Sequence, residues 1–412
     1  MTVGDTNMPA KRDAEARSDL ADARRAARRR TRRDEEKALP RTRARDATDT
    51  AKRDRFLVRG GLGTVLASQM VDSGALASDG PRLRARLRRD GYALLRGFLD
   101  ARAVDKARAV ALEALAESRP EAFVADPSAR AKGALRPDAR ALGLLARQDV
   151  AARREIRDVT ECDALFRLAA RVLFSDDDDS DDDAEATRSA RRRAKRRDAS
   201  ARGAASNRRA MTAAYKWLRA VAAGEFTGVH TDRVFLGGGS GRLVTAWIPL
   251  GDVRVADGAL MVAAGSHADA TFAGVRRTYG ASAAGRDGAR SGWLTDDAAA
   301  VRAIARRANG RGDGDDAVSE PGDGARVDDV EAHDDDAIDW RTCDFRSGDV
   351  VLLAPDVAHM SLANVSGEDA AGSGPRARVS VDTRWKPEGD DPDPRVRVWR
   401  RRREGTVETV TL

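Results

Sequence analysis

Two histidines and one aspartate in this sequence form a set that can bind a transition metal. His230 and Asp232 are separated by one residue, so an extended chain would place both side chains on the same side. His359 follows a short apolar segment that has the composition of a buried strand. Two neutral imidazoles and one carboxylate are the ligands that hold non-haem Fe(II) on one face and leave its other coordination positions open. His230, Asp232 and His359 are therefore candidate metal ligands and candidate catalytic residues.

The other two histidines of the sequence are weaker candidates. His333 also stands in a His-x-Asp sequence, but it lies in an acidic low-complexity stretch with no strand to hold its geometry. His267 follows a Gly-Ser dipeptide, and we expect it to hydrogen-bond the backbone of a turn. A lone His-x-Asp motif is weak evidence, because it occurs by chance in many chains. The alternative is that His230 and His359 are core histidines with no relation to each other.

The metal candidates lie in the part of the sequence that has strand patterning. Short apolar segments alternate with Gly-rich or Asp-Gly turns from about residue 215 to residue 267, and again after residue 347. The predicted strands in these two regions are Phe226–Phe235, Leu243–Leu250, Ala259–Val262, Val350–Leu353 and Ala377–Trp385.

Helical patterning precedes these strands. Residues 91–99 predict one short strand, and Asp100 is placed to cap the helix that follows it. The apolar face of that helix would consist of Val104, Ala107, Ala111 and Leu115. Helical patterning continues to about residue 174. This order predicts a mainly β fold with flanking helices, a jelly-roll or cupin-like barrel, in preference to a βαβ fold.

Three segments have compositions that oppose folding. Residues 1–55 hold 17 Lys and Arg against 11 Asp and Glu, which accounts for most of the net charge of +7 and predicts a disordered charged tail. Stretches rich in Asp, Arg, Gly and Ala at about 175–209 and 308–338 predict low-complexity insertions in a single domain that spans 56–408. The basic tail leaves an alternative open, a nucleic-acid- or chromatin-associated protein whose β-barrel modifies or tethers a macromolecule.

Composition also restricts the class of protein. The longest apolar runs are too short for a membrane-spanning helix, and two cysteines are too few for a disulfide framework or a cysteine zinc site. Nothing in the sequence resembles a signal peptide. We expect a soluble intracellular protein, placed in the cytoplasm with the nucleus as the alternative. Its expected partner is a small-molecule substrate and not nucleic acid, and its oligomeric state is left open.

Several motifs in a consistent order resemble the phytanoyl-CoA dioxygenase family of Fe(II)/2-oxoglutarate-dependent oxygenases. They are Gly91–Leu99, Tyr215–Val221, Phe226–Val234, Trp247–Asp252, Asp257–Leu260, Gly265–His267, Ser347–Leu352, the residues His359, Ser361 and Asn364, and Arg378–Trp385. The resemblance covers residues 85–390 apart from the two insertions. It implies a double-stranded β-helix that holds Fe(II) through His230, Asp232 and His359 and consumes 2-oxoglutarate and O2. Because relatives that halogenate replace the carboxylate ligand, Asp232 favours hydroxylation of a small organic or acyl substrate.

The resemblance also implies residues that bind 2-oxoglutarate. The family carries an arginine on the strand after the distal histidine, and Arg378 matches its place, with Arg376 as a rival on the same strand face. Ser361, two residues after His359, matches a hydroxyl group that contacts the same carboxylate. Trp247 matches an aromatic residue that lines the pocket, and a plain core role is its alternative.

Overall fold

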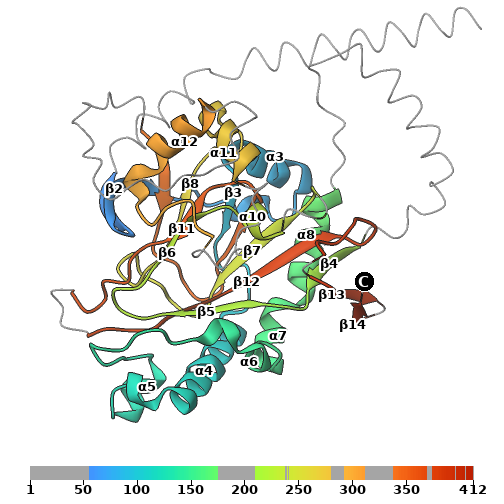
Figure 1. Cartoon of the computed structure of the whole chain (residues 1–412). Helices are drawn as coiled ribbons and strands as arrows, with labels where there is room; N and C mark the ends of the chain where they lie inside the picture. The colour runs from blue at the N-terminus through green and yellow to red at the C-terminus, as the bar shows by residue number, and fades with distance from the viewer. Residues whose placement is uncertain are drawn as a thin grey trace, which may run out of the picture. The chain divides into compact units, whose positions relative to one another are not determined.

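The chain forms two β-sheets, and both candidate histidine ligands lie on strands of the first (Figure 1). The structure is a computed structural model, and it describes residues 55–174, 209–236, 239, 241–279, 292–310, 337–368, 374–394, 396–403 and 405–411. The first sheet contains, in spatial order, β1 (Phe56–Gly60), β2 (Gly63–Gln69), β9 (Trp340–Thr342), β8 (Leu260–Ala263), β11 (His359–Ser361) and β6 (Thr227–His230). The second contains β14 (Thr406–Thr411), β13 (Val398–Arg403), β4 (Ala210–Ala213), β12 (Arg378–Pro387), β7 (Val244–Pro249), β10 (Val350–Leu353) and β3 (Tyr92–Leu95), and β5 (Trp217–Val221) pairs with β12.

The chain alternates between the two sheets. From β5 to β8, and again from β10 to β12, each strand lies in the sheet opposite to the strand before it. Among the strand pairs, β2 and β9 run parallel, and the other pairs described are antiparallel. This alternation is the winding of a double-stranded β-helix, which confirms the predicted mainly β barrel with flanking helices.

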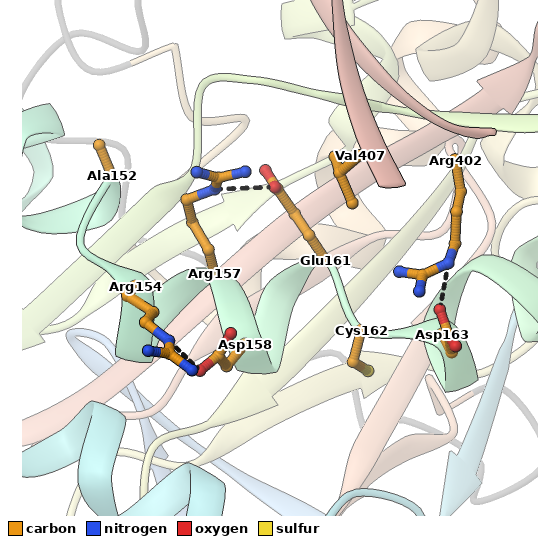
Figure 2. A pocket seen from close by; sticks show the side chains of 9 residues that line it. All are labelled: Ala152, Arg154, Arg157, Asp158, Glu161, Cys162, Asp163, Arg402 and Val407. Atoms are coloured by element: carbon orange, nitrogen blue, oxygen red, sulfur yellow. Dashed lines mark hydrogen bonds and ion pairs between the residues drawn. The ribbon is translucent and has the colours of Figure 1, made fainter. Parts of the chain in front are cut away.

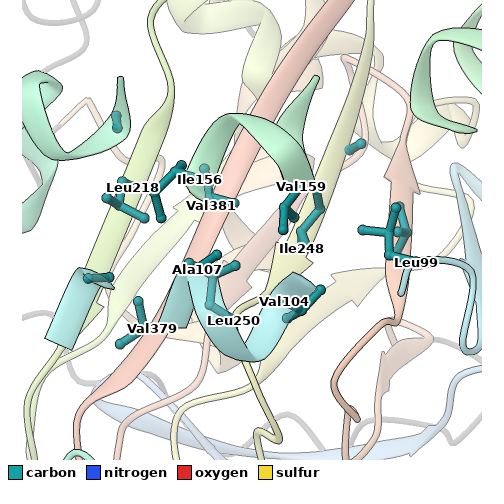
Figure 3. Close-up of a cluster of buried hydrophobic side chains, with 14 of the residues drawn as sticks. Leu99, Val104, Ala107, Ile156, Val159, Leu218, Ile248, Leu250, Val379 and Val381 are labelled. Atoms are coloured by element: carbon teal, nitrogen blue, oxygen red, sulfur yellow. The ribbon is translucent and has the colours of Figure 1, made fainter. Parts of the chain in front are cut away.

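Helices cover the outer face of the second sheet at its central strands, so that β12, β7, β10 and β3 are buried on both faces (Figure 3). Val379 and Val381 of β12 point toward α4 (Ala101–Ser118) and α7 (Arg154–Thr160) in one hydrophobic cluster. The residues of the opposite parity on β12, from Arg378 to Arg384, therefore face the barrel interior, because side chains alternate along a strand. As predicted, Asp100 caps α4 by accepting a hydrogen bond from the backbone N–H of Arg102.

The remaining helices are mostly short. They are α3 (Gly80–Asp90), α5 (Pro127–Ala131), α6 (Gln148–Ala151), α8 (Asp163–Phe174), α10 (Asp232–Leu236), α11 (Ala273–Thr278) and α12 (Val301–Asn309). Among the described residues, no helix combines the length and the apolar character that a membrane crossing requires.

The structure differs from the sequence prediction at β6. The sequence predicts a strand over Phe226–Phe235, but β6 ends at His230 and α10 begins at Asp232. The backbone N–H of Arg233 donates to the carbonyl of Pro355 instead of continuing the sheet ladder. This turn of chain places Asp232 at the start of a helix while it stays next to His230.

The predicted charged tail and the insertions at 175–209 and 308–338 fall, apart from a few flanking residues, outside the residues that the structure describes. The single domain over 56–408 therefore stays a prediction, although β14 continues beyond its expected end to Thr411. The hairpins β1–β2 and β13–β14 were not predicted from the sequence.

Candidate metal centre

His230 and His359 are direct neighbours across the pairing of β6 with β11. Their ring centroids lie 4.3 Å apart, and both side chains are buried. Asp232, two residues after His230, is fully buried beside them. One potential ligand atom from each of the three residues lies within 4.8 Å of the others. The structure therefore brings together the three residues that the sequence spacing singled out.

Each histidine ring is oriented by a backbone carbonyl two residues earlier in the chain. Nδ1 of His230 lies 2.8 Å from the oxygen of Gly228, and Nδ1 of His359 lies 3.0 Å from the oxygen of Val357. A carbonyl oxygen can only accept a hydrogen bond, so Nδ1 of each ring carries the proton. The lone pair of a neutral imidazole is then on Nε2, which is the state required for a metal ligand.

Electrostatics keep both kinds of ligand in the required charge state. Burial, followed by the neighbouring His359, lowers the pKa of His230 well below its ordinary value of 6.5. For Asp232, burial raises the pKa, but the charge of Arg384, the two neighbouring histidines and the hydrogen bond from Thr245 together outweigh it, and the net pKa is lowered. A neutral imidazole and an ionised carboxylate at neutral pH fit a divalent transition metal.

Two side chains of the second sheet hold the Asp232 carboxylate. Nη2 of Arg384, on β12, donates to Oδ1 at 2.7 Å, and the hydroxyl of Thr245, on β7, donates to Oδ2. The Arg384 guanidinium also stacks on the Trp217 ring, 4.5 Å from its centroid. Arg384 and Asp232 thus form a buried ion pair beside the candidate metal ligands.

Sequence reasoning missed Arg384, although a signal was present. From Arg378 to Arg384, polar residues alternate with Val379, Val381 and Thr383. Apolar residues at alternate positions face the helices, so the polar set faces the barrel interior, where a charged side chain needs a partner or a ligand.

The predicted cosubstrate arginine and its rival differ in their surroundings. Arg378 is 2% exposed; its Nη1 donates to the Ser380 hydroxyl, and its Nε has no hydrogen-bond partner among the described residues. Burial, and next the charge of Arg219, lowers the pKa of Arg378 to about 10, so it remains positive at neutral pH. Arg376 is half-buried and already pairs with Asp257, at 3.2 Å.

The other two predicted cosubstrate residues lie inside the barrel as well. Ser361 is on the same face of β11 as His359, and its hydroxyl accepts a hydrogen bond of 2.7 Å from the backbone N–H of Thr227. Trp247 shares the inner face of β7 with Thr245 and packs edge-on against Phe345, with ring centroids 4.8 Å apart. Its buried side chain belongs to the interior hydrophobic cluster, which is compatible with either role foreseen for it.

The remaining histidines do not join this centre in the described part of the chain. His267 lies in a turn, as expected, with Nε2 2.8 Å from the carbonyl oxygen of Arg88. His333 lies outside the described residues.

A separate cavity of about 620 Å³ lies against α7, α8 and the C-terminal hairpin (Figure 2). Its charged lining residues are already paired with one another. The pairs are Arg157 with Glu161 at 3.0 Å, Arg154 with Asp158 at 3.5 Å, and Arg402 with Asp163. This cavity offers no surplus charge to a ligand.

Comparison with known proteins gives one family and several similar structures. Residues 87–371 match the model of the phytanoyl-CoA dioxygenase (PhyH) family. Curated protein sequences give no match. The fold is similar to that of the epimerase SnoN, solved with Fe3+ and alpha ketoglutarate, at 16% identity and a TM-score of 0.39 over 77% of this chain and 87% of SnoN.

Two further solved structures show a similar likeness. The carbocyclase SnoK, from nogalamycin biosynthesis, is 15% identical with a TM-score of 0.41, covering 79% of this chain and 90% of SnoK. AviO1 from Streptomyces viridochromogenes Tue57 is 17% identical with a TM-score of 0.40, covering 77% of this chain and 98% of AviO1.

Proposed function

This chain belongs to the phytanoyl-CoA dioxygenase family, and from that membership we propose that His230, Asp232 and His359 are the iron ligands of an enzyme that hydroxylates a small organic or acyl substrate. The enzyme is a non-haem iron dioxygenase that uses 2-oxoglutarate and O2. The alternative function, a nucleic-acid-associated protein, has no support from the comparisons or from the site.

One observation carries the assignment of the ligands. Two histidines on neighbouring strands and one carboxylate converge within 4.8 Å, and both histidines have Nδ1 engaged by a backbone carbonyl. Two Nε2 atoms and one carboxylate oxygen form the facial set that holds Fe(II) and leaves room for cosubstrates. When bound there, iron with 2-oxoglutarate and O2 supplies the oxidation that replaces a substrate C–H bond by C–OH, with succinate and CO2 as coproducts.

The protein contributes orientation, charge and exclusion of water. Thr245 and Arg384 hold the Asp232 carboxylate, and the carbonyls of Gly228 and Val357 fix the histidine rings. Such supporting contacts keep ligands in place without rearrangement during turnover.

For 2-oxoglutarate we propose Arg378 as the residue that binds the distal carboxylate, with Ser361 and Trp247 lining the same pocket. Burial and a free Nε support Arg378, because a buried guanidinium with an unused donor can receive a carboxylate. Arg376 is less suited, because its guanidinium is already paired with Asp257.

The test is release of succinate from 2-oxoglutarate by the purified protein. We expect release that depends on added Fe(II) and O2 and that disappears in His230→Ala and His359→Ala variants. His267→Ala is the matched control and should retain the activity. Metal-dependent release that survives the loss of His230 or His359 would overturn the ligand assignment.

A further inference from the structure

Arg384 has more hydrogen-bonding capacity than its protein partners use. Its side chain is 4% exposed, and Nη2 donates to Asp232, but Nε and Nη1 have no hydrogen-bond partner among the described residues. Leaving buried donors of a charged group unsatisfied is costly, so such groups in native proteins are met by a ligand or by ordered water.

The guanidinium is held in one position. It stacks on the Trp217 ring at 4.5 Å, is anchored by Asp232 at 2.7 Å, and lies 3.8 Å from the Asp382 carboxylate. The free donors, Nε and Nη1, belong to the same planar group as the anchored Nη2. Because both are fixed beside the candidate metal ligands, a group that accepts from them would lie next to the reaction centre.

Charge on the inner faces of β5 and β12 is also unbalanced. Three arginines meet two carboxylates there, and these residues are Arg219, Arg378, Arg384, Asp232 and Asp382. A divalent iron and the 2-oxoglutarate dianion would cancel each other. One positive charge is then left in a buried site, which favours an anionic ligand.

From this we infer that the substrate carries an anionic oxygen group, a carboxylate in its simplest form, which Arg384 binds beside the iron ligands. The inference rests on the proposed function, because it assigns 2-oxoglutarate to Arg378 and the substrate to Arg384. It makes Arg384 a residue of substrate recognition as well as a partner of Asp232.

The experiment uses acetate as the probe and acetamide as its neutral isostere. The full chain is loaded with Zn(II), which is not oxidised, and with saturating 2-oxoglutarate, and binding is followed by saturation-transfer NMR at constant ionic strength. We expect acetate to bind saturably and about tenfold or more tightly than acetamide, since charge-assisted hydrogen bonds are the stronger ones.

Three variants locate the binding. Arg384→Gln should weaken acetate binding about tenfold or more, Arg384→Lys should weaken it less because the charge is kept while the planar fork is lost, and Arg400→Gln should leave it unchanged. Arg400 is a matched control, because it is a partly buried arginine of β13 that pairs with Glu161, at 3.3 Å. If Arg384→Gln does not fold, quenching of Trp217 fluorescence by acetate, compared with a Trp217→Phe variant, gives the same answer.

Several results would overturn the inference. The inference is wrong if acetate and acetamide bind equally well, if acetate binding is not saturable, or if Arg384→Gln binds acetate with wild-type affinity. Absence of saturable acetate binding is the result expected if 2-oxoglutarate itself covers Arg384. The proposed function fails separately, if the iron-loaded enzyme releases no succinate from 2-oxoglutarate. Acetate binding at Arg384 without succinate release would reject that function and leave an anion site.

Discussion

Asp232 is both a candidate metal ligand and half of a buried ion pair. A ligand at the mouth of a barrel would be expected to contribute little to packing, but Asp232 is fully buried and pairs with Arg384 at 2.7 Å. Removal of one partner from a buried pair leaves the other charge without compensation. The candidate metal site and the stability of the barrel are therefore coupled through this one carboxylate.

Replacing Asp232 should affect activity and stability together. We expect Asp232→Ala to abolish iron-dependent succinate release and to lower the free energy of unfolding by about 3 kcal/mol, because Arg384 loses its carboxylate. Asp232→Asn keeps an oxygen that can accept from Arg384, so it should lose the activity with a smaller loss of stability. Urea denaturation and iron content check the two effects, and an active Asp232→Ala variant would show that Asp232 is not a ligand.

The KM for 2-oxoglutarate of alanine variants can decide which of the two candidate arginines binds this cosubstrate. Arg378→Ala should raise the KM for 2-oxoglutarate by about tenfold or more, since a charge-assisted hydrogen bond contributes about 1.5–3 kcal/mol. Arg376→Ala removes a guanidinium that is already paired with Asp257, so its KM should change little. Steady-state kinetics on both variants decide, and the reverse order would transfer the role to Arg376.

The lowered pKa of the buried His230 should make the stability of the metal-stripped protein depend on pH. The pKa of His230 is lowered in the folded state, so below its ordinary value of 6.5 the unfolded chain binds more protons than the folded one. Stability should therefore fall as the pH drops below about 6.5, whereas the lowered pKa of Asp232 adds acid sensitivity only below the ordinary carboxyl range. Urea denaturation between pH 7 and about 5 measures the slope of the free energy of unfolding against pH. An unchanged slope in His230→Gln would exclude this residue as its cause.

At the scale of elements, β6 is held against a segment that follows the α11 region. The backbone of Val229 exchanges hydrogen bonds with Leu294 and Thr295, and the Trp293 ring lies over Gly228. A Cβ atom at position 228 would meet that ring at 2.4 Å. Since Gly228 also orients His230 through its carbonyl, the fit between Gly228 and Trp293 sets the position of a candidate metal ligand.

A size-exchange experiment tests this fit. Gly228→Ala should lower the free energy of unfolding by about 1–3 kcal/mol and weaken metal binding, because the added methyl group displaces β6. Adding Trp293→Ala should recover part of both losses, although the added methyl group would still meet the carbonyl oxygen of Thr295 at 2.8 Å, which limits the recovery. Gly241→Ala is the control, since a Cβ there meets nothing within 4 Å. No effect of Gly228→Ala on metal affinity would reject the coupling.

At the scale of the whole molecule, residues Arg55–Leu412 form one compact unit. Both sheets, their covering helices and the candidate metal centre are built from residues of this unit. The first strand begins at Phe56, directly after the charged segment that the sequence set apart.

Removal of residues 1–54 should therefore leave the enzyme intact. We expect a chain that starts at Arg55 to keep its iron-dependent succinate release and its midpoint of urea denaturation. The segment 1–55 has a surplus of only 6 positive charges, so any binding of DNA by the full chain should be weak and steeply dependent on salt. Tight DNA binding at physiological salt that is lost on truncation, together with no succinate release, would favour the nucleic-acid alternative.

The sequence by itself was sufficient for the local features. The cap at Asp100, the apolar face of α4 and most of the barrel strands follow from residue type and spacing, because short-range hydrogen bonds and alternation of side chains determine them. His230, Asp232 and His359 could be named as candidates because their chemistry is unusual and their motifs follow the family's order.

Tertiary structure alone decided what surrounds those residues. The register that sets His230 opposite His359 joins positions 129 residues apart, and the partnership of Arg384 with Asp232 joins β12 to the start of α10. Arg376 and Arg378 have the same type and the same strand parity, yet one is paired near the surface and the other is buried with a free donor. Burial and partners of a charged side chain depend on strands distant in sequence, and these determine whether an arginine stabilises the fold or is available to a ligand.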